Sequence, residues 1–100
     1  MTRLVITPLA ERDIESIADY ISHDNPARAL TFITELREQC ARIAGNPMGY
    51  RKRPELGKAL HSCSFGNCVL FFEATARQVT ILRVLHSARD IPAHLGSKHE

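Results

Sequence analysis

The stretch QVTILRVLHSARDI, residues 78–91, decides the fold of this chain. Its first half is a run of strand-forming residues that is apolar on both parities, which is typical of a strand buried on both faces of a sheet. Arg83 and His86 interrupt this run and differ in parity, so a regular strand would point them to opposite faces. Arg89 and Asp90 follow where the apolar run ends. We therefore expect this stretch to carry core residues together with the best candidates for a functional site.

The residues before this stretch predict two further strands. Residues 58–65 and 68–75 are strand-like, and the Gly-Asn pair between them is typical of a two-residue hairpin turn. Together with residues 78–86 they would form an antiparallel meander. A meander alone would leave residues 78–86 at an edge, whereas their two-sided apolarity calls for a neighbour on the other side. Residues 3–6 are the only candidate for that neighbour, and the pattern leaves their direction open.

Two amphipathic helices are expected between the first strand and the meander. Thr7 and Asn25 are each followed by a proline, an arrangement in which the first residue caps a helix and the proline takes its first position. The link between the helices is short, so they should pack as an antiparallel hairpin with their apolar stripes on the sheet. The stripe of the second helix is expected to contain Leu30, Ile33, Leu36, Cys40 and Ile43. The predicted fold class is α+β, with the order β-α-α-β-β-β and a helical hairpin packed on a mainly antiparallel four-stranded sheet.

The segment that joins the second helix to the meander is basic. Residues 48–57 are expected to form a loop, and this loop contains Arg51, Lys52 and Arg53. The run is either a solvated linker or a mobile basic edge for an anionic ligand. The first fifty residues hold 5 Lys/Arg and 7 Asp/Glu, a net charge of −2, whereas the last fifty hold 8 and 4, a net charge of +4. An anionic partner should therefore meet the C-terminal half.

Length and composition bound the class of protein. One hundred residues, 44% of them hydrophobic, predict a single domain over residues 1–100, with an ordered core over 3–91 and a flexible tail over 93–100. The chain shows no signal-peptide apolar region and no apolar run near the roughly 20 residues of a membrane span. Three cysteines, an odd number, fit a reducing cytoplasm better than a disulfide scaffold. We therefore expect a cytoplasmic protein without membrane contact.

Metal-competent side chains occur in the last three strands, at His61, Cys63, Cys68 and His86. The two-residue turn makes the two thiols diagonal neighbours roughly 7–8 Å apart by Cα, which is long for a disulfide. No C-x-x-C pair of the kind that holds zinc is present, and Cys40 lies on the apolar stripe of a helix. We expect no metal and no other cofactor. The chain also lacks a G-x-S-x-G elbow and a Gly-rich phosphate loop.

The remaining cluster consists of Arg83, His86 and Arg89, and the basic loop could join it. RNA cleavage by attack of a 2′-hydroxyl fits such a cluster, because arginine stabilises the scissile phosphate while histidine moves protons. The structural alternative pairs Arg83 with Asp90 or Glu73 and gives His86 a hydrogen-bonded place in the core. For Arg83 we favour the structural role.

Three segments resemble the ParE/RelE toxin superfamily. ILRVLHSARDI at residues 81–91 resembles the C-terminal signature of ParE toxins, written R-V-L-H-x-x-R-D. NPMGYRKRPEL at residues 46–56 resembles the family's link from the second helix to the sheet, and TPLAERDI at residues 7–14 is typical of its opening. The likeness covers residues 3–91. It implies the toxin of a type II toxin–antitoxin module, linked to growth arrest and plasmid stabilization. It also implies a ParD-like antitoxin whose C-terminal segment wraps the toxin, and no sequence-specific DNA binding.

The resemblance implies two targets. ParE members block DNA gyrase, whereas RelE members cut ribosome-bound mRNA and carry a Tyr or a His–Tyr pair near the C-terminus. Here Ser87 follows His86, and the only tyrosines are Tyr20 and Tyr50. We therefore favour a gyrase inhibitor over an enzyme. A RelE-like mRNA interferase acting through Arg83 and His86, and an inactive module that still binds an antitoxin, stay open as alternatives.

The resemblance also distributes roles within the motif. No residue is assigned as catalytic in the favoured interpretation. The residues interpreted as structural are Arg83, His86 and Asp90. The residues expected to form the surface for a target or partner are Arg51, Lys52, Arg53 and Arg89.

Overall fold

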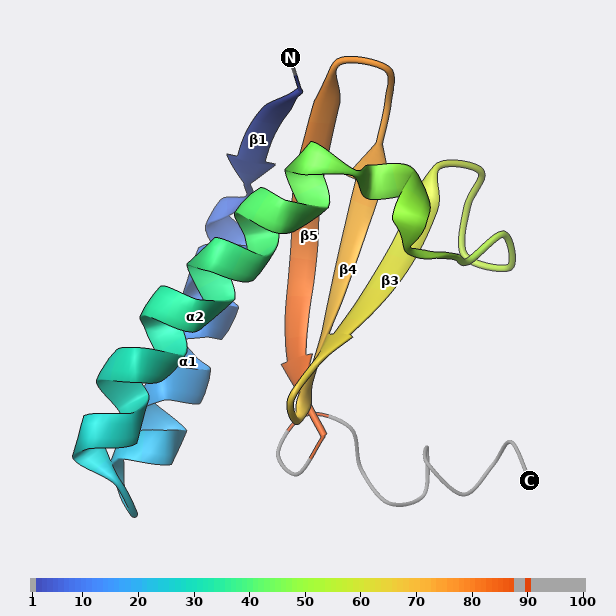
Figure 1. The fold of residues 1–100 in the computed structure, drawn as a ribbon. Helices are drawn as coiled ribbons and strands as arrows, with labels where there is room; N and C mark the ends of the chain where they lie inside the picture. The colour runs from blue at the N-terminus through green and yellow to red at the C-terminus, as the bar shows by residue number, and fades with distance from the viewer. Residues whose placement is uncertain (1, 88–89, 91–100) are drawn as a thin grey trace.

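Two helices lie against one face of a mixed five-stranded sheet in the computed structural model, which describes residues 2–87 and 90 (Figure 1). The elements are β1 (Arg3–Ile6), α1 (Pro8–Ser22), α2 (Pro26–Gly45), the 3-10 helix η1 (Pro47–Gly49), β2 (Arg51–Lys52), β3 (Leu60–Phe65), β4 (Cys68–Ala74) and β5 (Gln78–His86). The strand order is β1-β5-β4-β3-β2. The helices run side by side as the expected hairpin, and the predicted α+β class is confirmed.

The strand over residues 78–86 is found with the predicted bounds, and it has neighbours on both sides. β4 pairs with it antiparallel, and β1 pairs with it parallel, with Leu4 opposite Val79 and Ile6 opposite Ile81. β5 is therefore an interior strand over its first half, as predicted, but only one of its faces is buried, so the expectation of a strand buried on both faces was wrong.

A bulge explains why apolar residues occupy both parities of β5. The register between β4 and β5 shifts between Phe71 and Phe72, and Leu82 is the extra residue on β5. A bulge of this kind moves the buried set from one parity to the other. The buried positions on β5 are Val79, Ile81, Val84 and His86.

The sheet has five strands, so the predicted count of four is wrong. The missed strand is β2, in which Arg51 lies opposite Ser62 and Lys52 opposite His61. The backbone N–H of Arg53 extends this pairing by donating to the carbonyl of Leu60 at 2.8 Å. Part of the basic segment is thus fixed to the sheet edge by backbone hydrogen bonds, although a two-residue strand leaves almost no pattern in a sequence.

Both predicted helix starts are confirmed. Thr7 Oγ1 accepts from Ala10 N at 3.0 Å, and Asn25 Oδ1 accepts from Arg28 N at 3.1 Å, with a proline next in each case. One stripe residue was placed wrongly, because Leu30 is 71% exposed. The buried face of α2 passes through Ala29, and the next residue along a helix is rotated by about 100° from it.

No helix among the described residues is long and apolar enough to cross a bilayer. The expectations for Arg89 and for the tail over residues 93–100 concern positions outside the part of the chain that the structure describes.

Candidate functional site

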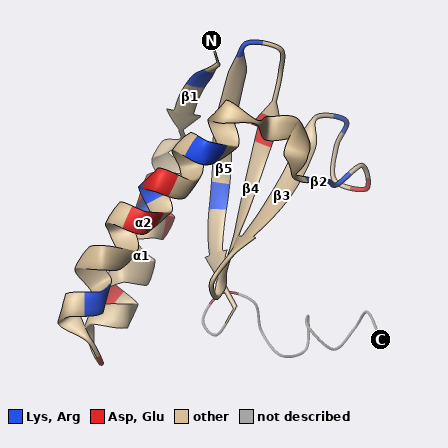
Figure 2. Ribbon diagram, in the orientation of Figure 1, with Lys and Arg blue, Asp and Glu red and all other residues tan. Residues whose placement is uncertain are grey.

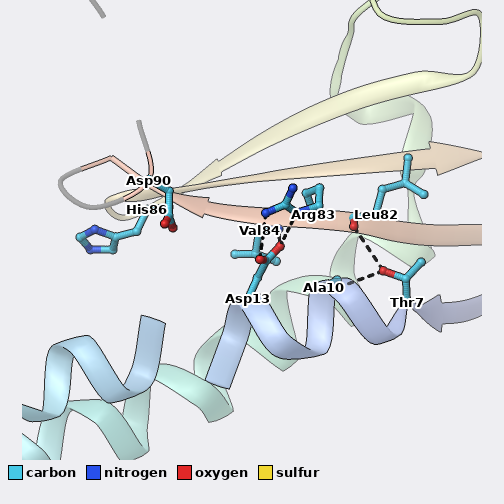
Figure 3. Close-up of polar contacts among 8 residues, drawn as sticks. All are labelled: Thr7, Ala10, Asp13, Leu82, Arg83, Val84, His86 and Asp90. Atoms are coloured by element: carbon cyan, nitrogen blue, oxygen red, sulfur yellow. Dashed lines mark hydrogen bonds and ion pairs between the residues drawn. The ribbon is translucent and has the colours of Figure 1, made fainter. Parts of the chain in front are cut away.

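The second half of β5 lies at an edge of the sheet, and side chains of other residues form hydrogen bonds with its open backbone groups. β1 ends opposite Ile81, and among the described residues no strand lies beside Leu82, Val84 or His86 on that side. Thr7 Oγ1 donates to the carbonyl of Leu82 at 3.2 Å, and the carboxylate of Asp13 accepts from Val84 N at 2.9 Å. These contacts come from the first turns of α1, which lies over the edge (Figure 3). Unpaired strand groups attract other strands, and α1 covers them here.

The same carboxylate holds Arg83. Asp13 Oδ2 accepts from Arg83 Nε at 2.7 Å and Oδ1 from an Arg83 terminal nitrogen at 3.1 Å, a bidentate ion pair. The hydrogen bond to Asp13 and the charge of its carboxylate raise the pKa of Arg83 above its usual range. The Asp13 side chain is 13% exposed and that of Arg83 45% exposed. The guanidinium is therefore neutralised on the side that faces the protein.

Arg83 is paired with Asp13, which was not among its expected partners, Asp90 and Glu73; of those two, Asp90 contributes a charge that also raises the pKa of Arg83. Asp13 lies 70 residues away in the sequence, and Arg83 reaches it because β1 has already ended at this level of the sheet. A signal existed in α1. Asp13 shares a helix face with the buried residues Ala10 and Ile17, and an acid on an apolar stripe demands a buried donor or cation.

His86 lies on the helix side of β5 and is 7% exposed. Its ring is 5.6 Å from the ring of Tyr20 between centroids, at an angle of 59°. Its backbone N–H donates to Asp90 Oδ2 at 2.9 Å, and its carbonyl accepts from Asp90 N at 2.6 Å. These two hydrogen bonds form a turn between His86 and Asp90, and this turn ends the strand. Tyr20 was missed as a neighbour because 66 residues separate it from His86 in the sequence.

The basic run at β2 divides into exposed and engaged side chains. Arg51 and Lys52 are exposed. Arg53 donates from Nε to Glu55 at 2.7 Å and from a terminal nitrogen to Ser62 Oγ at 3.3 Å. Because β3 and β4 separate β2 from β5, the basic run and Arg83 do not form one cluster.

The thiols are buried structural groups. Cys63 lies opposite Leu70, as the two-residue turn predicted, and all three cysteines are free. Burial raises the pKa of Cys40 and of Cys68 to about 11 and also raises the pKa of Cys63. Gln39 Nε2 donates to Cys63 Sγ at 3.2 Å. Within residues 2–87 and 90, no group of three side chains could hold a metal ion.

The structure thus defines a small α+β domain in which a helical hairpin covers a mixed sheet and closes the edge of β5. A family model described as the ParE toxin of the type II toxin–antitoxin system parDE matches residues 4–91. The chain belongs to the ParE toxin family.

Solved structures share the fold at low sequence identity. A chain of the chromosomal ParDE toxin–antitoxin system from P. aeruginosa superposes with a TM-score of 0.74 at 20% identity, covering 86% of this chain and 96% of that chain. A chain of the toxin–antitoxin complex RelBE2 from Mycobacterium tuberculosis gives a TM-score of 0.62 at 23% identity, with coverage of 85% and 96%. No curated protein matches this sequence significantly.

Proposed function

We propose that this ParE-family toxin inhibits DNA gyrase in the bacterial cytoplasm and that a ParD-like antitoxin neutralises it. The choice of gyrase as the target rests on the environments of Arg83 and His86 in the motif. Arg83 is held by both carboxylate oxygens of Asp13, and His86 is buried. This supports a motif that builds the domain and does not carry out chemistry.

A ribonuclease needs a cation on the scissile phosphate and a group that transfers protons to and from the substrate. The Asp13 carboxylate, which also accepts from Val84 N, offsets the charge that Arg83 would bring to a phosphate, and a phosphate that took its place would have to break the bidentate ion pair. A proton transfer by His86 would require exposure of a ring that now packs against Tyr20. These costs favour a toxin that acts by binding its target.

Arg51 and Lys52 are the proposed contacts with gyrase, together with Arg89 of the motif. Arg51 and Lys52 lie on β2, an edge strand, and their side chains are exposed. Arg53 is better suited to support them, since its bonds to Glu55 and Ser62 fix the segment that follows β2. Charged groups on such an edge increase the association rate and the specificity of a complex.

One observation favours a second candidate function, cleavage of mRNA. The structure brings the ring of Tyr20 next to that of His86. The chain therefore has a His–Tyr pair, although the two residues are far apart in the sequence. Tyr20 is 44% exposed. In this alternative Tyr20, His86 and Arg83 would act together after Asp13 releases the guanidinium.

Expression of the chain without an antitoxin separates these functions. The proposal predicts growth arrest, loss of negative supercoiling in a reporter plasmid and intact transcripts. It also predicts that Tyr20→Phe arrests growth as the parent does, because the hydroxyl has no chemical role. Transcripts cut during arrest, and spared with Tyr20→Phe or His86→Ala, would establish the ribonuclease instead. Unimpaired growth with a folded protein would indicate an inactive antitoxin-binding module.

A further inference from the structure

The sheet has an open face, the one that points away from the two helices. α1 and α2 both lie against the other face (Figure 1), where Leu70 and Phe72 are fully buried. Because side chains alternate along a strand, Val69 and Phe71 of β4 point to the open face. Leu85 of β5 lies opposite Val69 and points the same way. These three apolar side chains are half-buried, and no described helix covers them.

Cross-strand pairing arranges the open face in rows, because residues opposite each other on adjacent strands are direct neighbours. One row across β2, β3, β4 and β5 consists of Arg51, Ser62, Phe71 and Arg83. The next row consists of Ser64, Val69 and Leu85. With strands about 4.8 Å apart, the first row is about 14 Å long. An arginine thus lies at each end of this row, and the ring of Phe71 lies between them beside the apolar part of the second row.

The strands that build the open face are mainly cationic. Residues 51–86 hold 6 Lys/Arg and 2 Asp/Glu, a net charge of +4. Figure 2 shows that basic positions outnumber acidic ones over the strands and loops from β2 to β5. Arg51 is exposed, and the side chain of Arg83 is 45% exposed. An apolar centre with a cationic surround is complementary to an apolar segment that carries carboxylates.

We propose that the toxin binds gyrase through this open face and that the segment of gyrase bound there is apolar with acidic side chains at its sides. Its apolar side chains cover Phe71 and its neighbours in the second row, and one of its carboxylates lies beside Arg51. Asp13 accepts from Nε and from one terminal nitrogen of Arg83, so the second terminal nitrogen is the donor that another gyrase carboxylate meets. This inference rests on the proposed function and adds to it the contact surface and the chemistry of the partner segment.

The charges of the open face favour this occupant over others. A nucleic acid could stack a base on Phe71, but Glu73 lies on the same face and the Asp13 carboxylate offsets the charge of Arg83, so phosphates gain little there. A second copy of the chain would bring two sets of the same arginines together, which costs energy. The face is also continuous with Arg51, one of the proposed gyrase contacts.

Inhibition of purified gyrase by toxin variants tests the surface. Phe71→Ser removes the ring at the centre of the open face, and Ser64→Glu places a carboxylate beside Val69 at an exposed position. Each should raise the toxin concentration for half-inhibition by about tenfold or more. The matched controls on the exposed side of α2, Leu30→Ser and Thr34→Glu, should stay within about twofold.

Folding is checked by urea unfolding of each variant. If Phe71→Ser lowers the unfolding midpoint, Ser64→Glu provides the test alone, because its side chain is exposed. Inhibition as strong as that of the parent by either variant in its folded form would overturn the proposal.

Reversal of an acidic charge tests the chemistry of the partner segment. Glu73 is exposed and lies on the open face. Glu73→Lys should lower the toxin concentration for half-inhibition by about threefold, because it removes repulsion of the gyrase carboxylates. An unchanged or higher concentration would contradict an acidic partner segment.

Binding measurements on the same variants identify any other occupant. We expect no saturable binding of a labelled single-stranded oligonucleotide at micromolar toxin, and binding that Phe71→Ser abolishes would assign the face to nucleic acid. A dimer of the free toxin that Phe71→Ser dissociates would assign it to a second copy. Loss of antitoxin binding with full inhibition of gyrase would assign it to the antitoxin. Each of these three results would overturn the proposal.

Failure of this surface can be distinguished from failure of the proposed function. A parent toxin that leaves gyrase active rejects the proposed function and the surface with it. A parent toxin that inhibits gyrase, with equal inhibition by folded Phe71→Ser and Ser64→Glu, rejects only the surface.

Discussion

Asp13 and Arg83 join the first helix to the last strand through one carboxylate. Asp13 Oδ2 accepts from Arg83 Nε at 2.7 Å and from the backbone N–H of Val84 at 2.9 Å, while Oδ1 accepts a second guanidinium bond. The arginine of the family motif thus has a partner 70 residues earlier in the chain. The carboxylate serves the stability of the domain in two ways, as the counter-ion of Arg83 and as the acceptor for an open strand edge.

Replacement of Asp13 by alanine should lower the free energy of unfolding by about 2–3 kcal/mol, because Val84 N–H and Arg83 both lose their acceptor. Asp13→Asn should cost less, since the amide oxygen still accepts one hydrogen bond. Urea unfolding measures both, with Glu15→Ala on the exposed side of α1 as the control. A loss no larger than that of the control would show that the bridge contributes little.

Thr7 should matter more than the equivalent cap of the second helix. Its hydroxyl caps α1 at Ala10 and also donates to Leu82 O, whereas Asn25 only caps α2. Thr7→Ala should destabilise the protein by about 1–2 kcal/mol and Asn25→Ala by about 1 kcal/mol or less. Thr7→Ser keeps both bonds and should stay close to the parent. Equal losses for Thr7→Ala and Asn25→Ala would contradict a role for the contact with Leu82.

Stability should fall at alkaline pH because of the buried thiols. Burial raises the pKa of Cys40 and Cys68 from 9.0 to about 11, so the unfolded chain loses these protons before the folded protein does. Their contribution is complete below pH 9 and decreases as the pH rises toward 11, by about 1.4 kcal/mol per pH unit and thiol. Unfolding at pH 8 and 10 measures the slope. The double variant Cys40→Ala with Cys68→Ala should have a smaller slope, and an unchanged slope would assign the effect to other groups.

Charge reversal at the edge strand tests the proposed gyrase contacts. Arg51→Glu with Lys52→Glu should weaken gyrase inhibition by about tenfold or more without changing stability, because both side chains are exposed. Arg12→Glu on α1 is the matched control and should leave inhibition unchanged. Full inhibition by the double variant would place the contact surface elsewhere.

Much of the fold follows from local signals in the sequence. The bounds of β1 and β5, the caps Thr7 and Asn25, and the turn that sets Cys63 opposite Leu70 each depend on residues close together in the chain. These features were predicted because hydrophobic period and cap chemistry act over short distances.

The candidate site could not be predicted in the same way. The pair of Asp13 and Arg83 and the contact of Tyr20 with His86 arise only after the helical hairpin has packed on β5. The distance between Arg83 and the basic run depends on strand order, with β3 and β4 in between. Separation along the sequence does not predict which residues are close in a sheet where the first strand, β1, pairs with the last, β5.

The most direct test is the effect of the purified toxin on gyrase supercoiling of relaxed plasmid, with ribosome-bound mRNA assayed in parallel. We predict that the toxin at micromolar concentration blocks supercoiling or traps cleaved DNA, that the antitoxin restores activity, and that mRNA stays intact. Normal supercoiling at saturating toxin, with mRNA cleaved in a manner that His86→Ala abolishes, would contradict the account.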